Sequence, residues 1–165
     1  MIATRCQRNL ERLLKRLTLG VLLLLFLSVW GRSQECTSKV QGFLDHSGYA
    51  IKVLTPCQSW MATDVLSVPK GDGLSGVMLF AEGDDFVIVG TVIRTKAKLN
   101  LSSDLLDKLM HFNDDLTFVK VGIDRKGDLF IREELRADTV TAEQFKDSVK
   151  RIIAGSNKVY ATLSE

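Results

Sequence analysis

Two pairs of apolar segments, each joined by a short turn, constrain the fold of this chain more than any other feature. Only three or four turn-forming residues separate the members of each pair, which are segments 77–81 and 86–94 and segments 118–124 and 128–135. This arrangement predicts β-hairpins, in which neighbouring strands run antiparallel. We therefore expect an antiparallel sheet at the centre of the chain.

Three other segments have apolar residues at helical spacing, and we expect them to cover the sheet. They span residues 37–47, 101–116 and 141–163. The last has the clearest start, because Thr141 and Gln144 match a capping box. Gly155 is a weak point in this helix, since glycine lowers helix stability.

The region between the first helix and the first hairpin is less regular. Segment 49–55 alternates like a strand, whereas segment 60–66 is a weaker strand candidate. Pro56 interrupts the pattern between them, and residues 69–73 predict a loop. Antiparallel strands covered by helices indicate an α+β domain of two layers.

The N-terminal segment predicts export from the cytoplasm. A basic stretch at 5–16 precedes an apolar run of 14 residues at 17–30. Because a membrane-spanning helix needs about 20 apolar residues, this run fits a signal peptide better than a full span. We favour a cleaved signal at 1–31 over an uncleaved anchor, and a buried core helix is the weakest of the three interpretations. The folded domain is then 32–165.

A cleaved signal and an uncleaved anchor imply different locations for the folded domain. A cleaved signal implies a periplasmic or secreted protein, whereas an uncleaved anchor implies membrane attachment through 17–30 with the domain facing away from the cytoplasm.

Export changes the interpretation of the cysteines. Cys6 would leave with a cleaved signal, and Cys36 and Cys57 would remain in an oxidising compartment. A disulfide between them would enclose about 20 residues and contribute about 3 kcal/mol in a chain-entropy model. Two buried free thiols are the alternative. Neither cysteine has a second Cys or a His at the spacing of a metal site.

Charge and motifs argue against several functional classes. The chain has 22 basic and 20 acidic residues, but residues 1–31 hold five of the basic residues and one acid, so the remainder has a net charge of −2. A nearly neutral domain of mixed charge does not suggest nucleic-acid binding. The sequence also lacks the common nucleotide-binding, metalloprotease and serine-hydrolase motifs.

The titratable residues that stand out have simpler structural explanations. His46 and His111 have no recognisable partner in the sequence, so we place them at the surface or at helix ends. Asp114 and Asp115 fit a solvated helix terminus, and residues 124–128 lack the ligand pattern of a calcium loop. We therefore predict no catalytic residue, no metal site and no cofactor.

The C-terminal half carries a family resemblance. It combines a leucine-rich helix that ends at Asn113 with three motifs, KVGID at 120–124, GDLF at 127–130 and EEL at 133–135. These motifs resemble the YbjN family of bacterial sensory transduction regulator-like proteins, closely over 100–163 and more loosely over 37–95. The resemblance implies a five-strand sheet, the order α-β-β-β-α-β-β-α, and a fold similar to that of type III secretion chaperones.

The same resemblance implies a non-enzymatic protein-binding module, chaperone-like or adaptor-like. Secretion chaperones work in the cytosol, so the predicted export distinguishes this chain from them. A structural envelope component held by an uncleaved anchor is the second hypothesis. An enzyme whose site assembles from distant loops is the third.

The hairpin at 77–93 predicts a protein partner. Its strands are apolar on both faces, whereas the strand at 118–124 is apolar on one. Three helices can cover only one face, and a large exposed apolar patch is rare on a monomer. The loop 66–76, a second copy of the chain or an extended peptide could cover the other face. We predict a homodimer or a peptide ligand that contacts Met78, Phe80, Val87, Val89 and Ile93.

Overall fold

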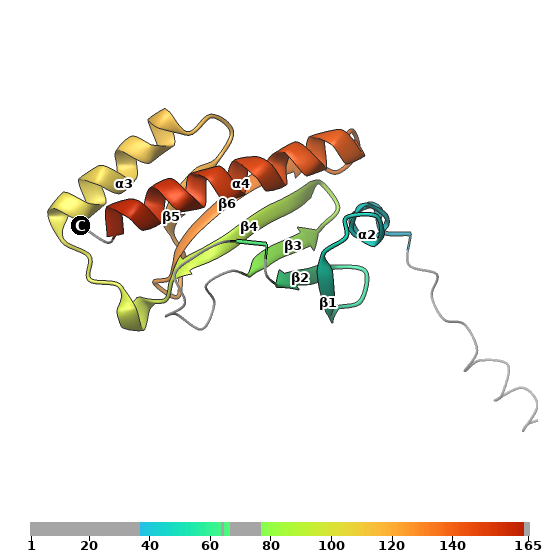
Figure 1. The fold of residues 1–165 in the computed structure, drawn as a ribbon, viewed down its shortest axis with the longest axis horizontal. Helices are drawn as coiled ribbons and strands as arrows, with labels where there is room; N and C mark the ends of the chain where they lie inside the picture. Colours follow the sequence, from blue (N-terminus) through green and yellow to red (C-terminus); the bar gives the residue numbers. More distant parts are fainter. Residues whose placement is uncertain (1–36, 64, 67–76, 164–165) are drawn as a thin grey trace, which may run out of the picture. The chain divides into compact units, whose positions relative to one another are not determined.

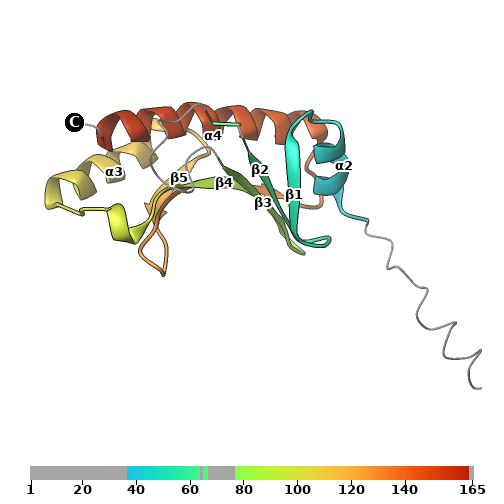
Figure 2. The same cartoon turned by 60° about the horizontal axis from the view of Figure 1, so that its bottom comes forward.

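The computed structural model describes residues 37–63, 65–66 and 77–163, which belong to a compact unit that begins at Thr37. Figures 1 and 2 show three helices lying on one face of a single sheet. This arrangement confirms the expected α+β class and its two layers.

The sheet has six strands, and the expectation of five is wrong. The strands are β1 (Ala50–Thr55), β2 (Ser59–Thr63), β3 (Met78–Glu82), β4 (Phe86–Arg94), β5 (Lys120–Ile123) and β6 (Leu129–Arg136). The helices are α2 (Lys39–Asp45), α3 (Ser103–Asp115) and α4 (Ala142–Leu163), with a short 3-10 helix η1 (Lys96–Lys98) after β4.

Strand β2 accounts for the difference from the expected order. Pro56 lies in the turn between β1 and β2, where its missing N–H removes no hydrogen bond from the sheet. After the turn, buried Trp60 and Ala62 alternate with half-buried Ser59 and Met61. The described order is therefore α-β-β-β-β-α-β-β-α.

All neighbouring strands are antiparallel, in the order β1-β2-β3-β4-β6-β5. Both expected hairpins, β3–β4 and β5–β6, are confirmed. The long pairing of β4 with β6 joins them, and β1 and β5 form the two edges of the sheet.

Helix α4 packs along β4 and β6 on the covered face. Its capping box is confirmed, because the Thr141 N–H donates to Gln144 Oε1 at 2.9 Å and the Gln144 N–H donates to Thr141 Oγ1 at 3.2 Å. A Cβ at Gly155 would lie only 2.7 Å from Ile131 Cδ1. The glycine therefore permits a close approach of α4 to the sheet, which outweighs its poor helix propensity.

Helix α2 is held against the end of β3. Ser38 caps the helix, and the Glu82 carboxylate accepts hydrogen bonds from the N–H groups of Lys39 and Val40 at 3.2 and 3.1 Å. A carboxylate at this position also complements the positive end of the helix dipole. Phe145 of α4 contacts both Phe43 of α2 and Phe80 of β3, with ring centroids 5.3 and 5.4 Å apart.

The covered face also contains one charged pair. Glu133 of β6 is 3% exposed and receives two hydrogen bonds from Arg151 of α4, at 2.7 and 2.9 Å. The bond to Glu133 raises the pKa of Arg151 above its ordinary value. The pair compensates a carboxylate that would otherwise be buried without a partner.

Residues 1–36, which contain the expected signal or anchor and Cys36, lie outside the described residues, as does the expected loop at 69–73. In the described ranges, no helix combines the length and apolar character needed to cross a bilayer.

Candidate functional site

The sheet face opposite the helices is the candidate site. In Figure 2 the helices lie on one side of the sheet, and no described helix or strand covers the other side. The strand register places one row of side chains across all six strands of this open face. The row runs through Lys52, Met61, Leu79, Gly90, Arg132 and Lys120.

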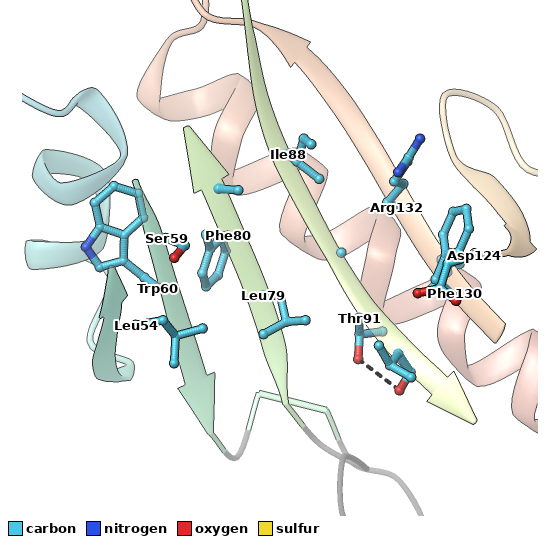
Figure 3. A pocket seen from close by; sticks show the side chains of 14 residues that line it. Leu54, Ser59, Trp60, Leu79, Phe80, Ile88, Thr91, Asp124, Phe130 and Arg132 are labelled. Atoms are coloured by element: carbon cyan, nitrogen blue, oxygen red, sulfur yellow. Dashed lines mark hydrogen bonds between the residues drawn. The ribbon is translucent and has the colours of Figure 1, made fainter. Parts of the chain in front are cut away.

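The centre of this face is a shallow apolar depression, which we call the open-face hollow (Figure 3). Its volume is about 320 Å³. Strands β3, β4 and β6 contribute most of its walls, and Leu54 and Asp124 lie at its ends. The lining side chains include Leu79, Ile88, Val92, Phe130 and Arg132.

Gly90 forms the floor of the hollow. It stands between Ile88 and Val92 on β4 and between Leu79 and Arg132 in the register row. A Cβ at Gly90 would lie 2.7 Å from the Ile131 carbonyl oxygen and 2.8 Å from Arg132 Cβ. Because side chains surround a position that has none, the sheet is indented there.

One wall of the hollow is charged. Arg132 Nη2 and Glu134 Oε1 are 2.9 Å apart, and Lys120 Nζ donates to Glu134 Oε2 at 2.8 Å. The Arg132 guanidinium also lies 4.9 Å from the centroid of the Phe130 ring, within the range of a cation–π interaction. Two cations thus share one carboxylate beside an apolar surface.

The two cations change the acidity of Glu134. The hydrogen bond from Lys120 is the largest cause that lowers the pKa of Glu134 below its ordinary value, and the charges of Arg132 and Lys120 act in the same direction. Partial burial opposes this effect. Glu134 is therefore ionised at neutral pH. Its two carboxylate oxygens already interact with Arg132 and Lys120.

The five residues predicted to contact a partner lie on the other face. Met78, Phe80, Val87, Val89 and Ile93 are at most 1% exposed and are buried under the helices. In the single chain α2 and α4 cover that face, so these side chains are not accessible there, and their contact with a partner stays a prediction. The half-buried residues between them in the sequence, including Leu79, Ile88 and Val92, line the open face.

Of the other residues considered in the sequence, the two histidines are not among the residues that line the hollow, whereas Asp124 lies at one end of it. The His46 Nδ1 lies 2.9 Å from the Gly42 carbonyl oxygen, which can only accept a hydrogen bond, and His111 lies 3.7 Å from Asp107 on the exposed side of α3. The Asp124 carboxylate accepts the N–H groups of Lys126 and Asp128, as expected for a turn. In the part of the chain that the structure describes, no group of three or more His, Cys, Asp or Glu residues is placed to hold a metal ion.

Cys57 lies at the β1–β2 turn, with a φ of 62°. It lines a surface depression of about 520 Å³ together with Thr37, the residue that follows Cys36. Cys36 is outside the described residues, so the bridge between Cys36 and Cys57 stays a prediction.

Sequence reasoning missed Gly90 and Arg132 as site residues. The sequence signal for Gly90 was a single glycine inside a strongly apolar strand. Such glycines mark bends in a strand or close approaches of a backbone or ligand. Arg132 had no comparable signal, because its position beside Gly90 depends on the β4–β6 register.

A comparison with known protein families shows which family the chain belongs to. A family model for YbjN, described as a putative bacterial sensory transduction regulator, matches residues 38–165. The chain belongs to the YbjN family. The match covers the whole described unit apart from Thr37, and it confirms the resemblance seen in the helix and hairpin motifs of the C-terminal half.

Solved structures with the same fold are distant in sequence. YbjN from E. coli is 18% identical, with a TM-score of 0.59, and the match covers 75% of this chain and 90% of that chain. A chain of the heterodimeric complex ExoU–SpcU, from the type III secretion system of Pseudomonas aeruginosa, is 14% identical, with a TM-score of 0.53 and coverage of 74% and 95%. An uncharacterized protein from Methanothermobacter thermautotrophicus is 12% identical, with a TM-score of 0.53 and coverage of 76% and 94%.

At these identities, the structural likenesses show the fold alone. A search among curated proteins found no match to the chain.

Proposed function

We propose that this member of the YbjN family is a protein-binding module, adaptor-like or chaperone-like, that receives an apolar segment of a partner protein in the open-face hollow. The observation that carries the proposal is an indented apolar surface of about 320 Å³ on a sheet face that no described helix or strand covers. Concave apolar surfaces with a few polar groups are typical of binding sites.

Two further observations support a binding role over a catalytic one. The described residues that line the hollow include neither His nor Cys, which are the usual groups for proton transfer or nucleophilic attack near neutral pH. The fold is also similar to that of a chain in the ExoU–SpcU complex, which is an assembly of two different proteins.

We further propose that the domain works outside the cytoplasm, in the periplasm or after secretion. The basic and apolar pattern at 1–31 supports this location. A bridge between Cys36 and Cys57 is consistent with it, since Thr37 and Cys57 line one depression. A reporter that is active only in the cytosol, fused after Glu165, would contradict export if it were active.

Binding is tested with a defined probe. The probe is a fluorescein-labelled synthetic peptide of alternating valine and threonine residues, with a proline at each end to limit self-association. Fluorescence anisotropy with residues 32–165, which contain the compact unit that begins at Thr37, should give saturable binding. A peptide with serine in place of every valine should not bind, because it has no apolar side chains to bury.

A matched pair of variants locates the site. Leu79→Lys places a charge in the hollow and should weaken probe binding by about tenfold or more, since a lysine there must be desolvated when the probe binds. Leu106→Lys makes the same change on α3, where Leu106 is 44% exposed, and should leave the affinity unchanged. Circular dichroism of both variants checks that they fold.

Two results would contradict the proposed ligand. Equal weakening by both variants would show that the probe binds by general hydrophobicity. If residues 32–165 instead form a dimer in light scattering, which Leu79→Lys dissociates, and the probe does not bind, a second copy of the chain occupies the hollow.

A further inference from the structure

We infer that the open-face hollow selects partner segments that carry a carboxylate next to apolar residues. The inference rests on the proposed binding function. It adds to that function the chemical class of the partner segment that binds in the hollow. It follows from the charges that surround the hollow.

The charges on the open face are unequal. In the register row that crosses the sheet, the charged residues are Lys52 at one edge and Arg132 and Lys120 towards the other. Glu134, in the neighbouring row, is shared by Arg132 and Lys120. On this wall of the hollow, one carboxylate therefore faces two cations.

The other acid in the hollow, Asp124, lies at one end and forms no ion pair with Arg132 among the described residues. The Asp124 carboxylate accepts two backbone N–H groups in its turn, from Lys126 and Asp128, at 2.8 and 2.9 Å. It is thus committed to the geometry of the β5–β6 turn. A bound segment would meet the Arg132 guanidinium on one wall, where Arg132 and Lys120 share a single carboxylate.

Arg132 has guanidinium N–H groups that can donate hydrogen bonds to a bound segment. Its side chain is 41% exposed, and its hydrogen-bonded ion pair with Glu134 uses Nη2. The Phe130 ring lies against the guanidinium and holds its plane next to the apolar floor. A carboxylate adjacent to valine- or leucine-like side chains would match both parts of this surface.

The test uses two versions of the probe peptide that differ only in the central residue, which is glutamate in one and glutamine in the other. The full domain, residues 32–165, should bind the glutamate peptide about tenfold more tightly at low ionic strength, as expected for one charge-assisted hydrogen bond. The preference should shrink as salt is added, because Arg132 is partly exposed.

Three variants assign the preference to Arg132. Arg132→Met should abolish the difference between the two peptides, while Arg132→Lys should keep part of it, because the charge remains. Lys158→Met removes a cation from α4 and should keep the full preference. If Arg132→Met unfolds, the comparison of wild type with Arg132→Lys still measures the contribution of the guanidinium.

The outcomes separate this inference from the function on which it rests. Equal binding of both peptides by the wild type overturns the inference and leaves the binding function intact. A preference that survives Arg132→Met also overturns it, since another group would then recognise the carboxylate. If neither peptide binds, both the inference and the proposed ligand class fail.

Discussion

The two faces of strands β3 and β4 are both apolar, but they have different surroundings. On one face, Met78, Phe80, Val87 and Val89 are at most 1% exposed beneath the helices. On the other, Leu79, Ile88 and Val92 are half-buried and no described helix or strand lies over them. The first set belongs to the hydrophobic core, because the helices bury it. The second set is not buried by any described helix. This difference is the basis for our proposal that the second face receives a partner.

The largest expected effect is on the covered face. Phe80→Ala should lower the free energy of unfolding by about 3–5 kcal/mol, because it removes a fully buried ring and leaves a cavity. The measurement is urea denaturation followed by circular dichroism.

The matched control is Ile88→Ala on the open face. It should cost about 1 kcal/mol or less, since its side chain is already partly in water. Equal losses for the two variants would contradict the distinction between the faces.

A smaller effect is expected at the charged pair of the covered face. Arg151→Met should lower the free energy of unfolding by about 2–3 kcal/mol, because it leaves the Glu133 carboxylate buried without a counter-charge. Arg151 is itself 34% exposed, so the loss is smaller than for a wholly buried pair.

The double variant Glu133→Gln with Arg151→Met sharpens this prediction. It should recover part of the lost stability in the same denaturation experiment, since no charge is then left unpaired. A double variant no more stable than Arg151→Met alone would count against the desolvation argument.

The smallest effect concerns the ion pairs of the open face and depends on pH. Glu134 has a lowered pKa in the folded state, so its interactions stabilise the fold above the ordinary value of 4.5. This contribution is lost as the pH falls through the lowered folded-state pKa. Lys120→Met should therefore reduce stability slightly at about pH 7, and the difference from wild type should vanish at about pH 2.

Urea denaturation of both proteins at the two pH values measures this change. A difference of the same size at both pH values would show that Lys120 acts through packing and not through its charge on Glu134.

Local patterns were sufficient to predict much of the fold. The two hairpins and the capping box of α4 depend on residues close together in the sequence, and both are confirmed. Strand β2 was harder to predict, because it is short and directly follows the turn that contains Pro56.

The candidate site depended on information that a single sequence does not contain. Alternation shows that Phe80 and Leu79 point to opposite faces, but it does not show which face the helices cover. The approach of Arg132 to Gly90 needs the register between β4 and β6, which are distant along the chain. The sequence therefore predicted two apolar faces on this hairpin without showing which of them stays uncovered by the helices.

Methyl-labelled nuclear magnetic resonance tests the central claim most directly, because β4 alternates between the faces one residue at a time. With the glutamate peptide bound, intermolecular contacts should appear at the methyl groups of Leu79, Ile88 and Val92. They should be absent at Val87, Val89 and Ile93, which are at most 1% exposed. Contacts confined to the helices, for example at Leu106 or Met110 of α3, would contradict the assignment of the binding surface to the open face of the sheet.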